Sequence, residues 1–131
     1  MNTKLDKIFT EISAGELVDK ITILQIKKEK IKNADKLKEI EKELSSLDQT
    51  YKKYIPNSLI ITKLFGELKN INQKLWDIED GKRAAEKNNN FNDEFIQLAR
   101  NVYKFNDERA KIKLAINNNL GSNIKEVKSY E

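Results

Sequence analysis

The stretch ISAGELVDKITILQI, residues 12–26, starts like a capped helix and then becomes too apolar for a helix with one solvent face. Ser13 and Glu16 have the spacing of a capping box, in which each side chain accepts a hydrogen bond from the other residue's backbone N–H. Ile12 and Leu17 flank this pair as a hydrophobic staple. The pattern predicts a helix start and leaves open what covers the helix's second apolar side.

Apolar residues continue along the chain at spacings of three and four, the period of an amphipathic helix. The phase breaks near Asn33, Pro56 disfavours helix at the preceding residue, and the stretch KNNNFND has the composition of a loop. The predicted helices are about 14–32, 35–54, 59–87 and 93–118. We expect an all-α fold, an antiparallel four-helix bundle with coiled-coil-like packing.

The length of 131 residues predicts one helical domain over residues 1–131. Residues 1–12 form a lead-in that fits either a helical turn or an extended segment, and residues 122–131 form a tail of undecided order. We find no apolar run long enough for a membrane span and no apolar core of a signal peptide near Met1. We therefore expect a cytoplasmic protein without membrane insertion.

The composition contains neither Cys nor His. This excludes thiol nucleophiles, disulfides, Ser-His or Cys-His catalysis and zinc sites built from thiolate or imidazole. Any chemistry must use carboxylates, Lys, Arg, Tyr or an oxygen-ligand site for magnesium. We expect no cofactor.

The net charge of +4 comes from 25 basic and 21 acidic residues. The two signs alternate in segments such as KEIEKEL, so no basic stripe with aromatic stacking residues emerges. The sequence therefore predicts a solvated surface of mixed charge and no nucleic-acid binding.

Several predicted helices carry more apolar residues than one stripe requires. Ile23 and Ile26 lie well round the first helix from Leu17 and Leu24, and Phe65 lies off the main seam of the third. Such width indicates either a broad internal face or a surface covered by another subunit. We take Ile23, Ile26 and Phe65 as the candidate interface of a homodimer or of a helical protein partner.

Polar residues cluster where the third and fourth predicted helices face each other. Arg109 occupies a seam position, where a charge needs a partner, and Asp77 or Glu79 could supply one. The candidate polar cluster comprises Trp76, Asp77, Glu79, Asp80, Tyr103, Asn106, Asp107 and Arg109. It fits an interhelical ion-pair network or a pocket for a small anionic or sugar-like ligand.

Acidic pairs at helical spacing also occur on two segments, Glu16 with Asp19 and Asp77 with Asp80. They are similar to the magnesium ligands of all-helical nucleotide pyrophosphohydrolases. In a regular up-down bundle the pairs would lie about 24 Å apart at 1.5 Å per residue, too far for one metal. We expect no metal site and keep these four carboxylates as the alternative.

The strings SAGELVDKITILQIK, LWDIED, LARNVYKFNDERAKIK and LGSNIKEVKSY together resemble a small bacterial family of unknown function, over Ser13 to Tyr130. Members of that family often accompany glycosyltransferases and other surface-polysaccharide genes, which implies a cytosolic accessory role and assigns no catalytic residue. The residues that match its strings include Glu16, Asp19, Lys20, Trp76, Glu79, Asp80, Asn106, Asp107 and Arg109.

The resulting hypothesis is a non-catalytic accessory or scaffold protein that self-associates through its helices. An enzymatic role stays open. The alternative is a helical bundle that binds or converts a small ligand, like a magnesium-dependent nucleotide pyrophosphohydrolase or a chorismate mutase.

Overall fold

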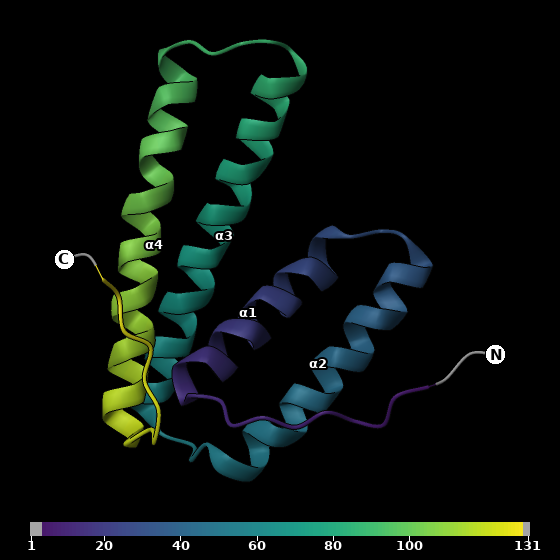
Figure 1. Cartoon of the computed structure of the whole chain (residues 1–131), viewed down its shortest axis with the longest axis vertical. Helices are drawn as coiled ribbons and strands as arrows, with labels where there is room; N and C mark the ends of the chain where they lie inside the picture. Colours follow the sequence, from purple (N-terminus) through teal and green to yellow (C-terminus); the bar gives the residue numbers. More distant parts are fainter. Residues whose placement is uncertain (1–3, 130–131) are drawn as a thin grey trace.

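The computed structural model describes residues 4–129 and contains four α-helices (Figure 1). They are α1 (Ala14–Lys30), α2 (Ala34–Tyr54), α3 (Leu59–Lys87) and α4 (Asp93–Leu120). The predicted all-α class and four-helix bundle are confirmed. Of the predicted lead-in and tail, residues 1–3 and 130–131 lie outside the described range.

Each helix begins at a polar side chain that caps it. The capping oxygens belong to Ser13, Asn33, Ser58 and Asn92, and each accepts a hydrogen bond from a backbone N–H three residues later. This satisfies donors that the first helical turn leaves without a partner. At the other end of α4, Gly121 has a φ of 63°, the left-handed conformation that glycine adopts without strain.

The first helix lies at the centre of the fold. α1 packs against α2, α3 and α4, whereas α2 packs along α1 and reaches α3 mainly where the Tyr51 ring meets Phe65, with ring centroids 5.9 Å apart. In Figure 1 the α1–α2 hairpin meets the α3–α4 hairpin at one end and diverges from it, so the far part of the α3–α4 hairpin extends beyond α1. The two hairpins therefore do not run side by side over their full lengths.

Two hydrophobic clusters meet α1 on two of its faces, about 100° apart. One joins Leu17, Ile21 and Leu24 to α2, and the other joins Val18 to α3 and α4. The second apolar side of α1 is thus covered within the chain. Ile26, with 1% of its surface exposed, belongs to this interior, so packing within the fold already accounts for it.

The lead-in is not helical. Residues 4–12 form no regular secondary structure, and Leu5, Ile8 and Phe9 are 77%, 81% and 87% exposed. Asn123 of the tail donates to the Glu11 carboxylate at 2.6 Å and so holds the end of the lead-in near the start of α1. Among residues 4–129, no helix has the length and apolar character needed to cross a bilayer.

Candidate functional site

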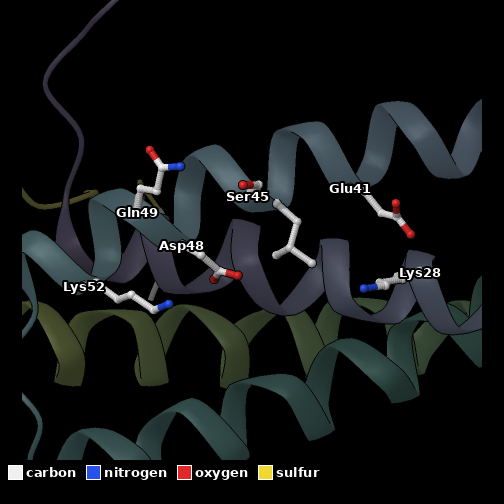
Figure 2. Close-up of a pocket in the computed structure, with 7 residues that line it drawn as sticks. Lys28, Glu41, Ser45, Asp48, Gln49 and Lys52 are labelled. Carbon is white, nitrogen blue, oxygen red and sulfur yellow. The ribbon is translucent and has the colours of Figure 1, made fainter.

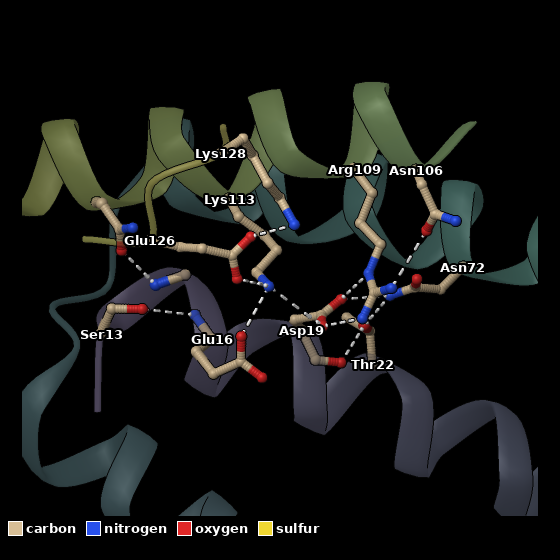
Figure 3. A network of polar contacts seen from close by, with 12 residues as sticks. Ser13, Glu16, Asp19, Thr22, Asn72, Asn106, Arg109, Lys113, Glu126 and Lys128 are labelled. Atoms are coloured by element: carbon tan, nitrogen blue, oxygen red, sulfur yellow. Dashed lines mark hydrogen bonds and ion pairs between the residues drawn. The ribbon is translucent and has the colours of Figure 1, made fainter. Parts of the chain in front are cut away.

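The buried carboxylate of Asp19 organises the contact between α1, α3 and α4. Its side chain is 1% exposed, and Arg109 of α4 donates to both of its oxygens, from Nε at 2.9 Å and from Nη2. Asn72 of α3 donates to the same carboxylate at 2.9 Å and to the Thr22 hydroxyl at 2.9 Å. One carboxylate thereby links three helices (Figure 3).

These contacts set the charge state of Asp19. Burial alone would raise its pKa, but hydrogen bonds from Arg109 and Asn72 and the charges of Arg109 and Lys113 outweigh burial and lower the pKa below its usual value. The hydrogen bond to Asp19 likewise raises the pKa of Arg109. The pair is a fixed ion pair at neutral pH.

Lys113 extends the network by one turn of α4. Its ammonium lies 2.7 Å from Glu16, 3.4 Å from Glu126 of the tail and 3.8 Å from Asp19 (Figure 3). Glu126 also pairs with Lys128, and this hydrogen bond is the main cause that lowers the pKa of Glu126. Across residues 4–129, every buried side-chain nitrogen or oxygen has a hydrogen-bond partner, so the network is internally satisfied.

A close helix contact explains why these groups meet. The Gly15 N–H donates to Asn117 Oδ1 at 2.6 Å, and a Cβ added at Gly15 would lie 2.5 Å from the Lys113 carbonyl oxygen. The absent side chain lets the start of α1 approach the α4 backbone. Glu16 and Asp19, three residues apart, then face Lys113 and Arg109, four residues apart on α4.

A groove opens beside this network, between α1, α3 and α4, with a volume of about 470 Å³. We call it the Trp76 groove. It is lined by Ile23, Ile26, Asn72, Leu75, Trp76, Glu79, Asp80, Arg83, Asn106 and Arg109. Its lining combines four apolar side chains with charged side chains of both signs.

The structure brings part of the predicted polar cluster together. The groove includes five of those residues: Trp76, Glu79, Asp80, Asn106 and Arg109. Asp77, Tyr103 and Asp107 do not line it. Asp77 is exposed and accepts from Gln73 at 3.4 Å, and Tyr103 is exposed. Of the candidate interface, Ile23 and Ile26 line the groove, while Phe65 packs against Tyr51.

The expected partner of Arg109 is corrected. Arg109 pairs with Asp19 of α1, and Asp77 and Glu79 are exposed on α3. A regular up-down bundle would place Asp19 far from residue 77 along the helix axis. The hydrogen bond from Asn72 instead shows that Asp19 lies one to two helical turns from residue 77. The assumption failed because the hairpins meet at one end and diverge, and because their helices have unequal lengths.

The alternative magnesium ligands are not arranged as a metal site. Glu16 and Asp19 point to Lys113 and Arg109, while Asp77 and Asp80 are exposed on α3. In the described part of the chain, no three carboxylates are grouped so that they could hold a metal ion. Glu16 also departs from the predicted capping box: its N–H donates to Ser13, but its carboxylate binds Lys113.

Sequence reasoning missed the residues that complete the network. They are Gly15, Thr22, Asn72, Lys113, Asn117 and Glu126. A signal existed on α4, where Arg109, Lys113 and Asn117 recur every four residues and so form one polar stripe. The stripe lies beside the apolar seam of the same helix, where Ile112 and Ile116 pack into the core.

A second hollow, of about 320 Å³, lies between α1 and α2 (Figure 2). Lys28 of α1 and Glu41 and Asp48 of α2 line it together with Leu44, Ser45, Gln49 and Lys52. Only Leu44 is apolar, so this hollow is a polar seam on the surface of the hairpin. It has no aromatic or apolar floor of the kind the Trp76 groove has.

The comparisons with known proteins assign the chain to a family. Residues 8–131 match the Family of unknown function (DUF6165), and the chain belongs to that family. No curated protein and no solved structure matches the chain.

Proposed function

We propose that this member of the DUF6165 family is a non-catalytic accessory or scaffold protein that binds an amphipathic helix of a protein partner in the Trp76 groove. The observation that carries the proposal is the groove's lining. Ile23, Ile26, Leu75 and Trp76 are apolar, and Glu79, Asp80, Arg83 and Arg109 add charges of both signs. An apolar floor with a charged rim suits the apolar face and polar flanks of a helix.

The groove also has the dimensions of a helix-binding surface. Its α3 wall consists of residues 72, 75, 76, 79, 80 and 83, which is one face of a helix over three turns. The opposite wall comes from α1, which diverges from α3 along the groove (Figure 1). A helix laid between these walls would form a three-helix contact, a common mode of apolar packing.

The buried charges support a structural role for the network. A general base works best with a pKa near the operating pH, whereas the pKa of Asp19 is lowered and both of its oxygens are bonded to Arg109. Lys113 is surrounded by carboxylates. These groups therefore hold α1, α3 and α4 in register and shape the groove beside them.

One observation favours a second candidate, a small anionic or hydroxyl-rich ligand. Arg109 has five N–H donors, and its hydrogen bonds to Asp19 and Asn106 use three of them. The remaining donors lie in a groove that also contains the Trp76 ring and the Asn72 amide. A sugar-like or acidic molecule could use the same surface, and the experiment below separates the two.

Three further parts of the proposal rest on the sequence. Self-association follows from the excess of apolar residues, and both the cytoplasmic location and the link to surface-polysaccharide synthesis follow from the resemblance. On this basis we expect the protein to act as an adaptor beside cytoplasmic enzymes of surface-polysaccharide synthesis.

The test is site-specific photocrosslinking in living cells. A benzoyl-phenylalanine at Arg83, exposed on the groove rim, should crosslink to a protein; the same residue at Lys42, exposed on α2, is the matched control. Equal products at both positions, or none at Arg83, would refute the proposal. A thermal-shift screen of nucleotides, nucleotide sugars and prephenate-like acids, with and without magnesium, accompanies it. Stabilisation by one of them that Asn106→Leu abolishes would favour the ligand instead.

A further inference from the structure

We infer that the occupant of the Trp76 groove is the lead-in, residues 4–12, of a second copy of this chain, which becomes helical as it binds. The inference rests on the proposed groove function and names the partner. It predicts a reciprocal dimer in which each copy inserts its lead-in into the other's groove. Four features of the chain carry it.

The first feature is the pattern of the lead-in. Leu5, Ile8, Phe9 and Ile12 recur at intervals of three, one and three residues, so in a helix all four would share one face. In this chain the segment is extended, and Leu5, Ile8 and Phe9 are largely exposed. A segment with a helical pattern and no helix has the character of one that folds on binding. The exposed side chains are its anchors.

The second feature is size. The α3 wall of the groove runs from Asn72 to Arg83, about 16 Å at 1.5 Å per residue. A helix over residues 4–12 would be about 13 Å long. The segment therefore fits the groove lengthwise, with the three anchors facing Ile23, Leu75 and Trp76.

The third feature is charge. In a helical lead-in, at about 100° per residue, Lys4 lies on one flank of the apolar face with Glu11 beside it, Asp6 lies on the other flank, and Lys7 lies on the opposite side of the helix. Glu79 and Asp80 are exposed side by side on the groove rim. Glu79 pairs with Lys82 at 3.3 Å, an exposed contact of the kind that exchanges at little cost. Lys4 can therefore meet a carboxylate of the rim.

The fourth feature is that the segment cannot reach its own groove. Ser13 caps α1 directly after residue 12, so a helical lead-in would have no linker with which to fold back. Ile23 and Ile26 lie about 15 to 20 Å further along α1. The hydrogen bond between Asn123 and Glu11 also holds the end of the lead-in at the start of α1. The occupant must come from another copy.

A membrane surface is the competing destination for such a segment, but the charges oppose it. Lys4 and Lys7 are balanced by Asp6 and Glu11, so the segment has no net positive charge to attract anionic lipid. A protein groove with charges of both signs suits this segment better.

The main experiment measures the mass of the whole chain by sedimentation, up to about 100 µM. The expected species is a dimer of the 15.3 kDa chain. Trp76 is the only tryptophan, so its emission should shift to shorter wavelength as the dimer forms and covers the groove. A chain that stays monomeric throughout overturns the inference.

Variants test which surfaces form the dimer. Replacing Leu5, Ile8 and Phe9 by Asp should give a monomer that keeps the circular dichroism of α1 to α4 and loses only the helical signal of the bound lead-in, because these side chains are exposed in the single chain. The matched control is Leu59→Asp with Val127→Asp, at sites that are 91% and 87% exposed elsewhere, and it should stay dimeric. A dimer that survives the lead-in variant, or is lost in the control, overturns the inference.

A charge swap tests the pairing itself. Lys4→Glu, and Glu79→Lys with Asp80→Lys, should each weaken the dimer by roughly tenfold or more, and the three changes together should restore it. Additive weakening overturns the inference.

Two further outcomes identify the failure. If the lead-in variant keeps its crosslinks from Arg83 to another protein, the groove function stands and the self-association fails. If neither the wild-type chain nor the lead-in variant gives crosslinks from Arg83, both proposals fail. A monomer that binds anionic vesicles through Leu5, Ile8 and Phe9 would assign the segment to membranes and overturn the inference.

Discussion

Replacing Gly15 by Ala should destabilise the fold strongly, although alanine favours helices over glycine by up to about 1 kcal/mol. The added Cβ would lie 2.5 Å from the Lys113 carbonyl oxygen and 3.0 Å from Asn117 Oδ1. The first of these atoms is backbone and cannot rotate away, so α1 must move. Overpacking of this kind costs about 1 to 3 kcal/mol. Weakening the Gly15 to Asn117 hydrogen bond adds about 1 kcal/mol.

With about 1 kcal/mol regained from helix propensity, the net expectation is a loss of about 1 to 3 kcal/mol. At an unfolding entropy of about 2.1 cal/mol/K per residue, this lowers the Tm of a chain of this length by about 4 to 11 °C. Urea unfolding followed by circular dichroism measures the free energy, and a thermal scan measures the Tm.

The matched control is Gly66→Ala, in the interior of α3. A Cβ at Gly66 would meet nothing within 4 Å, so the same substitution should stabilise the fold by about 0.5 to 1 kcal/mol. The reasoning would be refuted if Gly15→Ala were neutral or stabilising, or if both variants changed stability in the same direction. Opposite signs for one chemical change would locate the cost in the contact between α1 and α4.

Three other substitutions test the network. Asp19→Asn should cost about 3 kcal/mol at pH 7, because it leaves Arg109 with a neutral partner in a buried site. Since the folded pKa of Asp19 is lowered, its stabilisation is complete above its unfolded pKa of about 3.9 and is lost as the pH falls through the folded pKa. The gap between wild type and Asp19→Asn, measured by urea unfolding, should therefore stay constant from about pH 5 to 8 and shrink below about pH 4; a constant gap down to pH 2 contradicts this. Arg109→Lys should cost about 1.5 to 3 kcal/mol because lysine cannot make both bonds to Asp19 at once, and an unchanged urea midpoint would show that the second bond contributes nothing. Ser13→Ala should cost about 1 kcal/mol through the lost helix cap, whereas Ser13→Asp, which keeps an acceptor, should lose much less by the same assay.

Local signals in the sequence were sufficient for the helices. Ser13 marked a helix start and Asn33 a break between helices, and the structure uses both residues as caps. Capping depends on residues three positions apart, so no long-range information is needed. The predicted boundaries differ from the observed ones by two residues or fewer.

Only part of the candidate site could be predicted from the sequence. Trp76, Glu79, Asp80, Asn106 and Arg109 were selected from one hairpin, whose turn fixes which residues of α3 and α4 lie level. The contribution of α1 was missed, because no short turn connects α1 to either helix of that hairpin. Asp19 was consequently considered as a metal ligand, while the structure shows it as the partner of Arg109.

The sequence alone determined the helices, their caps and the two faces of α1 that must be buried. The tertiary structure decided how far α1 is displaced along α3 and α4, and with it the partner of Asp19 and the groove beside Trp76. The physical reason is that an apolar stripe repeats with every turn or two, so sliding a helix by that distance changes its hydrophobic match little. The register is instead fixed by contacts that occur once: the close approach at Gly15 and the bonds from Arg109 and Asn72 to Asp19.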